Sequence, residues 1–347
     1  MKIEIITTPN DLLRETGFGT QKACIAFMTS LLKFGHDAVI TVCHNQGDLN
    51  AIVKRKPELV VLAMKYMPLK NGGRIWFSEY FTTHNINYTG SQKASLLYDS
   101  DKVSAKKKIA SHGIATAEFF VTKPDEFETE SDLPLPLPLF IKPLNAANGN
   151  GVDRNSIAHT FIQYKNKVKA LHAKFKTPVL VEVFLTGREF TIALIETDDQ
   201  LMASPLEVIA PDEDGFKFLG AKVKSQNTEV LKRISLFDIH SDASDLAKKV
   251  FVALGARDFA RIDIKMDQNK KMHFIEINLV PGMTKGSSYF PQSCEIETGL
   301  KYHEVVGLMI QGGIARCQSK ADKTITGTCD PIHGPPKELD TKIVSLF

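Results

Sequence analysis

The chain has 347 residues, of which 43% are apolar and 24% charged, and this is the composition of a globular protein with two or three domains. Its formal net charge of +3 is too small to favour nucleic acid or a membrane surface as a partner. No apolar stretch is long enough for a signal peptide or a membrane span, and the five cysteines lack metal-ligand spacing, so we expect a cytoplasmic protein with reduced thiols.

The first 95 residues predict an α/β unit with a parallel sheet. Strands are expected at 2–7, 38–42 and 59–63, and a helix through Leu32 connects the first two. Ligands of parallel sheets bind at the carboxyl ends of the strands, where the glycine-containing segment 15–20 lies. A plain strand-to-helix connection is the simpler interpretation of that segment.

One long helix is expected at 91–112, because Gly113 is a good residue to end it. The helix carries four lysines, most of which are expected on the solvated surface: Lys102, Lys106, Lys107 and Lys108. Residues 131–138 then space prolines with leucines, which predicts an extended connector into a strand at 139–142.

Lys142 ends that strand and leads into a loop rich in Gly and Asn, residues 143–152. Backbone N–H groups in such a loop can cradle phosphate while the lysine supplies a point charge. The loop is not a P-loop, because no Gly-Lys-Ser/Thr follows it. A flexible hairpin tip without a ligand is the alternative.

Residues 178–194 predict a strand, a turn and a second strand, with apolar residues around Glu182 and Glu189. A carboxylate in such surroundings needs a partner. A ribose hydroxyl or an adenine amino group would serve, and so would a neighbouring Lys or Arg.

Residues 211–226 are polar and form either a mobile lid over a charged substrate or an ordinary surface loop. This segment carries Lys217, Lys222 and Lys224. Helices are expected at 235–254 and 300–315. The chain loses apolar residues from Gln318 onward, which predicts a peripheral or disordered tail at 318–347.

The most informative stretch, residues 258–284, predicts two strands joined by a polar turn. One register separates apolar from polar residues by pairing Ile262 with Ile277 and Ile264 with Ile275. The opposite face of the hairpin then carries Arg261, Asp263, Glu276 and Asn278.

The same register places Asp263 opposite Glu276, and Arg261 opposite Asn278. Like charges that face each other across a strand pair are destabilising. A divalent cation would offset this repulsion, because two carboxylates and an amide oxygen are ligands that Mg2+ takes. A solvated sheet face with some charge is the alternative. The turn at Pro281 and Gly282 favours a functional site over a solvated face, since it brings a backbone close to whatever the strand end binds.

In their order and spacing, these motifs resemble the ATP-grasp ligases, and specifically the D-alanine–D-alanine ligase family. The resemblance covers about residues 1–315 and rests most on 142–284: the lysine strand with its glycine loop, the two glutamates around a turn, Arg-x-Asp, and Glu-x-Asn-x-x-Pro-Gly-Met-Thr. It implies an α/β ATP-grasp fold in which mixed-sheet domains clasp ATP. The domains it implies are an N-terminal substrate domain at 1–95, ATP-grasp subdomains at 96–185 and 186–317, and the tail at 318–347.

The resemblance also implies a role for each candidate site residue. Lys102 and Lys142 would contact the phosphates of ATP. Glu182 would lie by the adenine and Glu189 by the ribose, and Lys222 would lie in a closing loop. Mg2+ (or Mn2+) would be held by Asp263, Glu276 and Asn278. Arg261 and the backbone N–H of Gly282 would stabilise the developing oxyanion. Ser287 would bind the carboxylate of the second amino acid, and Glu15 would approach the ammonium group of the first.

Two stretches depart from the family's pattern. The family's glycine loop carries a Ser-Ser pair after its first glycine, whereas this chain has Asn148-Gly149-Asn150. The family's first domain carries His-Gly-x-x-Gly-Glu-Asp-Gly, whereas residues 63–74 here read AMKYMPLKNGGR. Both stretches lie where the first substrate and the γ-phosphate would be handled, so the identity of the first substrate is left open.

Three functions remain open at this point. The first is a ligase that activates a carboxylate as an acyl phosphate and forms a dipeptide, because Arg261 and Ser287 are both in place for a second amino acid. The family resemblance suggests a homodimer as the possible assembly of such a ligase. The second is an ATP-grasp ligase that joins other amino acids or biosynthetic intermediates. The third is a nucleotide-binding protein without turnover. The two departures motivate the second and the third.

Overall fold

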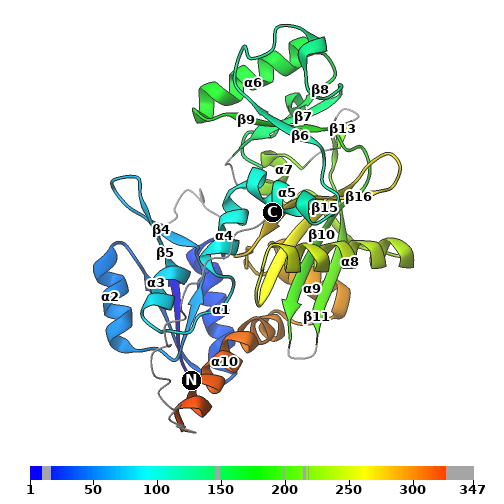
Figure 1. Cartoon of the computed structure of the whole chain (residues 1–347). Helices are drawn as coiled ribbons and strands as arrows, with labels where there is room; N and C mark the ends of the chain where they lie inside the picture. The colour runs from blue at the N-terminus through cyan, green and yellow to red at the C-terminus, as the bar shows by residue number, and fades with distance from the viewer. Residues whose placement is uncertain (10–16, 145–148, 198–199, 214–215, 218, 326–347) are drawn as a thin grey trace, which may run out of the picture.

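The computed structural model describes residues 1–9, 17–144, 149–197, 200–213, 216–217 and 219–325. Three regions, each built on its own sheet, are arranged with the N-terminal region at the lower left, the central region at the top and the C-terminal region at the right (Figure 1). Among the described residues, no helix has the length and apolar character needed to cross a bilayer.

The N-terminal region contains the expected parallel sheet, in the order β2-β1-β3. Its strands are β1 (Lys2–Thr7), β2 (Asp37–Val42) and β3 (Leu59–Leu62). The remaining elements are α1 (Gln21–Lys33), α2 (Gln46–Arg55), the hairpin β4 (Tyr66–Pro68) and β5 (Arg74–Trp76), and α3 (Phe77–Thr83). The three strands predicted from the sequence are therefore confirmed, with ends that shift by one residue at most.

The helix expected at 91–112 is two helices, α4 (Lys93–Ser100) and α5 (Lys102–Ser111). The chain breaks at Asp101, whose backbone is extended and whose carboxylate caps α5 by accepting the Ser104 N–H at 3.0 Å. The prediction of one helix was wrong because it overlooked this N-cap. Lys102 consequently becomes the first residue of α5.

The central region is a four-stranded antiparallel sheet in the order β6-β9-β7-β8, covered by α6. Its elements are β6 (Phe119–Thr122), the 3-10 turn η1 (Glu130–Asp132), β7 (Leu139–Pro143), η2 (Arg154–Ser156), β8 (Ile157–Ala158), α6 (Phe161–Phe175) and β9 (Val179–Val183). The proline-spaced connector packs its leucines against the core of this region: Leu133, Leu135 and Leu137.

The C-terminal region is a five-stranded antiparallel sheet in the order β14-β11-β10-β15-β16. Its strands are β10 (Glu189–Glu196), β11 (Leu201–Ile209), β14 (Val230–Arg233), β15 (Phe259–Met266) and β16 (Met272–Asn278). Helices α8 (Phe237–Ala253) and α9 (Tyr289–Thr298) pack against it. Between β11 and β14 lie β12 (Asp212–Glu213), β13 (Phe216–Lys217) and α7 (Ala221–Gln226).

The last helix, α10 (Tyr302–Ile325), packs between the N-terminal and C-terminal regions. It contacts α1 and β3 of the first and α9 and β10 of the second (Figure 1). It is longer than the expected helix at 300–315. The tail predicted from Gln318 was therefore wrong as far as Ile325, since helical backbone continues through polar residues. Residues 326–347 lie outside the described part of the chain.

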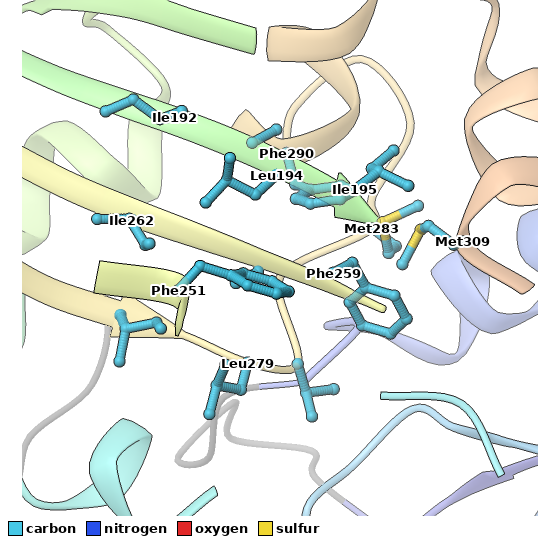
Figure 2. Close-up of a cluster of buried hydrophobic side chains, with 14 of the residues drawn as sticks. Ile192, Leu194, Ile195, Phe251, Phe259, Ile262, Leu279, Met283, Phe290 and Met309 are labelled. Carbon is cyan, nitrogen blue, oxygen red and sulfur yellow. The ribbon is translucent and has the colours of Figure 1, made fainter. Parts of the chain in front are cut away.

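A single apolar cluster spans the N-terminal and C-terminal regions. Figure 2 shows part of it: Phe259 of β15 lies near Met283 and Met309, Ile262 lies on the same strand, and Leu194 lies on the neighbouring strand β10. Phe259 is 1% exposed and its ring meets Phe290 at 6.3 Å between centroids. This packing anchors the strand that carries the hairpin's polar face.

We predict that Phe259→Ala lowers the free energy of unfolding by about 3–5 kcal/mol, because it leaves a cavity in this core. Urea denaturation measures the effect. Phe237→Ala is the matched control, because Phe237 is 81% exposed and its loss should change stability by less than about 0.5 kcal/mol. Equal destabilisation by the two variants would contradict the placement of Phe259.

Candidate active site

A cavity separates the central sheet from the C-terminal sheet and encloses about 920 Å³, part of it open to solvent. Strands β7 and β9 line one side, β10, β15 and β16 line the other, and α5 and α7 contribute a residue each. Its charged lining residues are four lysines and four carboxylates: Lys102, Lys142, Lys224, Lys265, Glu182, Glu189, Asp263 and Glu276. Most of the residues predicted for the nucleotide and the metal are thus brought together.

The carboxylates of the hairpin form one end of the cavity. Asp263 lies opposite Glu276, and Arg261 opposite Asn278, as predicted from the sequence. Arg261 donates to both oxygens of Asp263, at 3.1 and 2.9 Å, and the Thr191 hydroxyl donates to Oδ1 at 2.7 Å. The Lys102 ammonium lies 3.3 Å from Glu276 Oε2. Two cations, Arg261 of β15 itself and Lys102 of α5, therefore offset the repulsion between the two carboxylates.

The electrostatic balance at Glu276 favours its ionised form. Burial by itself would raise the pKa of this carboxyl, but the positive charges of Lys102, Lys224 and Lys142 outweigh it and hold the pKa well below its usual range. The amide Nδ2 of Asn278 is buried and has no hydrogen-bond partner among the described residues, which fits an amide that faces a ligand. Two carboxylates and an amide oxygen are a donor set suited to a hard divalent cation.

The predicted register fails at one position. A bulge follows Asp263, so that Ile264 pairs with Phe274 and not with Ile275. Phe274 is fully buried in the core, whereas Ile275 lines the cavity beside Glu276. Strict alternation had placed Ile275 on the apolar face with Ile277, and Phe274 on the polar face with Glu276. The extra residue of a bulge turns one apolar side chain from the core towards the cavity.

The partners of the two other cavity glutamates are lysines, the second possibility that the sequence left open. Glu182 is 3% exposed, and its two oxygens lie 2.7 Å from the ammonium groups of Lys106 and Lys142. Glu189 lies 2.8 Å from Lys265. Lys106 is fully buried and is therefore an exception to the expectation that most lysines of this stretch are solvated. The available signal was its position one turn after Lys102 on the same helix.

Two further predictions fall near the rim of the cavity. Lys224, on α7, lines the cavity, whereas Lys222 is exposed and is not among the lining residues. In the glycine loop, Gly149 and Asn150 line the cavity, whereas 145–148 lie outside the described residues. Glu15 also lies outside them.

The segment after β16 places a hydroxyl beside Gly282. A Cβ on Gly282 would lie 2.8 Å from the Oγ of Ser288, and this Oγ accepts the Thr284 N–H at 2.9 Å. Ser287, the predicted residue, is half-buried and donates its backbone N–H to Thr284 at 3.2 Å. The structure thus favours Ser288 over Ser287 as the hydroxyl at this turn. Nearby, the Arg261 guanidinium lies 5.4 Å from the centre of the Tyr289 ring.

The departing stretch at 63–74 is tied to the hairpin by a buried ion pair. Lys65 lies 3.0 Å from Asp99, and the other oxygen of Asp99 accepts the Leu279 N–H at 2.7 Å. Leu279 directly follows Asn278. Asp99 therefore holds the end of β16 against the N-terminal region. No local pattern predicts this pair, because the two residues lie on separate elements.

The chain matches the family model described as D-ala D-ala ligase C-terminus over residues 108–311. A D-alanine–D-alanine ligase of Bordetella petrii is 30% identical over 239 residues, 68% of this chain and 71% of the relative. One from Chromohalobacter salexigens is 27% identical over 289 residues, 81% of this chain and 85% of the relative.

Solved structures show the same fold. The D-alanine–D-alanine ligase of Bacillus anthracis, complexed with ATP, superposes with a TM-score of 0.70 at 20% identity, over 92% of this chain and 99% of that one. The VanG D-Ala:D-Ser ligase of Enterococcus faecalis gives 0.65 at 18% identity, over 90% of this chain and 100% of that one. Since the family model alone spans more than half of the sequence, this chain belongs to the D-alanine–D-alanine ligase family of ATP-grasp enzymes.

Proposed function

We propose that this protein is an ATP-dependent ligase that joins two D-amino acids, with D-alanine as the first candidate for both, for peptidoglycan synthesis. The observation that carries the proposal is the cavity between the two sheets, where Asp263 and the ionised Glu276 lie with lysines suited to phosphate. The relatives' printed names supply the candidate substrate.

The residues of the chain supply positioning and charge for this chemistry. ATP phosphorylates the carboxylate of the first amino acid, and the amine of the second attacks the acyl phosphate and displaces phosphate. Negative charge then develops on the oxygen of the tetrahedral intermediate. Arg261 and the backbone N–H of Gly282 are assigned to that oxygen, because fixed donors stabilise developing charge without reorganisation. Ser288 or Ser287 is assigned to the second substrate's carboxylate.

Lys102, Lys142 and Lys224 are assigned to the phosphates of ATP, Glu182 to the adenine and Glu189 to the ribose. All five line the same cavity. Phosphoryl transfer needs positioning and charge neutralisation more than a protein nucleophile. Glu15 and Lys222 keep their predicted roles as candidates.

Asp263, Glu276 and Asn278 are assigned to Mg2+ (or Mn2+), which would neutralise phosphate charge when bound. The ionised state of Glu276 and its position opposite Asp263 on the hairpin support this assignment. A cytoplasmic location and a homodimer, expected from the sequence, stay predictions.

A different first substrate is the second candidate function. It is favoured by the Lys65–Asp99 pair, in which both side chains are at most 4% exposed. This pair brings a charged lysine into the stretch where the family's His-Gly pattern is missing. A ligase with this change would keep the ATP site and accept another amino acid.

The test of both candidates is phosphate release from Mg–ATP with D- and L-amino acids, singly and in pairs, with products identified by mass spectrometry. We expect release with D-alanine alone and formation of its dipeptide. Release with a different pair only would support the second candidate. No release with any pair, despite tight ATP binding, would overturn the proposal of a ligase.

Glu276→Gln should lower turnover by about 100-fold or more, because it removes a charged metal ligand, while it lowers stability only modestly. The modest cost follows because the loss of the Lys102 pair is offset by relief of the repulsion with Asp263. Steady-state kinetics and urea denaturation measure the two effects. Glu297→Gln is the control, because Glu297 pairs with Arg233 and His240 outside the cavity. Full activity of Glu276→Gln would contradict the metal assignment.

Lys224→Ala should raise the KM for ATP about tenfold, since it removes a cation from the cavity, whereas Lys222→Ala should change it by less than about twofold. Initial rates against ATP concentration decide between them. A larger effect at Lys222 would show that the closing segment turns that lysine towards the nucleotide.

A further inference from the structure

Lys106 is a buried cation that the proposed mechanism does not use. It is 0% exposed, and it is not among the residues that line the cavity. Its ammonium lies 2.7 Å from Glu182 Oε1 and donates to the Thr116 hydroxyl at 2.8 Å. A fully buried lysine is rare unless it is paired, so this arrangement needs a reason.

Lys142 shares the same carboxylate from the other side. Its ammonium lies 2.7 Å from Glu182 Oε2, and both residues line the cavity. Glu182 is therefore held between a cation that the protein encloses and a cation that faces the cavity. One of the two ammonium groups is enough to neutralise the carboxylate.

This redundancy has an energetic consequence for Lys142. If Lys142 were the only partner of Glu182, its transfer to a phosphate would leave a buried carboxylate unpaired. Breaking a buried pair in that way is strongly unfavourable. With Lys106 in place, Glu182 keeps one partner at 2.7 Å when Lys142 moves.

Lys106 also connects the nucleotide end of the cavity with the metal end. Thr116, which accepts from Lys106, donates its own hydroxyl to the Phe274 carbonyl at 2.9 Å. Phe274 is the residue at the bulge that turns Ile275 towards the cavity beside Glu276. The lysine is thus fixed by β9 on one side and by the strand of the metal ligands on the other.

We propose that Lys106 is a positioning residue that fixes Glu182 as an ionised hydrogen-bond acceptor for the nucleobase and releases Lys142 from Glu182 to bind phosphate. The proposal rests on the assignment of this cavity to ATP. An ionised carboxylate only accepts hydrogen bonds, so it suits the amino group of adenine and disfavours the carbonyl oxygen at the same position of guanine. Lys106 would therefore act on nucleotide affinity and on base selection without touching the nucleotide.

Four variants test the proposal: Lys106→Met, Lys106→Arg, Glu182→Gln, and the double variant Lys106→Met/Glu182→Gln. Lys107→Met is the control, because Lys107 is the exposed neighbour on the same helix. Calorimetric titration with Mg–ATP and Mg–GTP measures affinity, and urea denaturation of the ligand-free protein measures whether residues 106 and 182 are coupled.

We expect Lys106→Met to weaken ATP binding by about 10- to 100-fold, because Lys142 is then retained by Glu182. Lys106→Arg should restore part of the affinity. The double variant should recover to within about fivefold of the wild type, because no buried carboxylate is left to retain Lys142. Its preference for ATP over GTP should shrink, since a glutamine side chain both donates and accepts.

In the ligand-free protein, the double variant should be more stable than the sum of the two single effects predicts. Wild-type ATP affinity in Lys106→Met, or a double variant that binds no better than Lys106→Met, would overturn the proposal. If Lys106→Met does not fold, the Arg variant and the double variant give the same decision. A wild type that binds ATP but forms no dipeptide would refute the ligase function alone, since nucleotide affinity still tests Lys106.

Discussion

The need to neutralise buried carboxylates links this fold to its site. Asp263, Glu276 and Glu182 lie on strands of two different sheets. Their cations come from β15 itself, from α5 and from β7. An unpaired charge in such surroundings is costly, so each carboxylate ties its strand to the element that supplies its cation. The residues of these ion pairs also line the cavity between the two sheets with charge, apart from Arg261 and Lys106.

Helix α5 has the central place in this arrangement. Because Asp101 caps it, Lys102 begins the helix and points its ammonium at Glu276. One turn later, Lys106 reaches Glu182 in the other sheet. A single helix therefore connects the strand of the predicted metal ligands with the strand of the predicted adenine contact. A rigid link of this kind suits a reaction that depends on the position of phosphate relative to a carboxylate.

The N-terminal region is the part in which this chain departs most from the family's pattern. This region contains the parallel sheet β2-β1-β3, and its α1 and β3 pack against α10. The residues at the carboxyl end of that sheet differ, and a buried pair between Lys65 and Asp99 fastens them to the end of β16. The proposed ATP site and the stretch where the first amino acid is expected thus lie on separate regions, which allows one to change while the other is kept.

The sequence by itself predicted a large part of this protein. The strands of the N-terminal sheet and the hairpin carboxylates follow from local patterns, because the period of apolar residues reports which face of a strand is buried. The register was predicted at Asp263 and Glu276 because one alignment separates polar from apolar side chains. Membership of the ligase family followed from the same motifs and was confirmed by the comparisons.

Only the tertiary structure decided the remaining features. The bulge at Ile275 depends on how Phe274 fits the core, and alternation alone cannot predict it. The burial of Lys106 depends on a carboxylate far away in the sequence. Backbone geometry likewise decides that Lys224 and not Lys222 lines the cavity, and that the hydroxyl beside Gly282 belongs to Ser288. These features arise from contacts between distant elements, which a pattern of neighbouring residues does not contain.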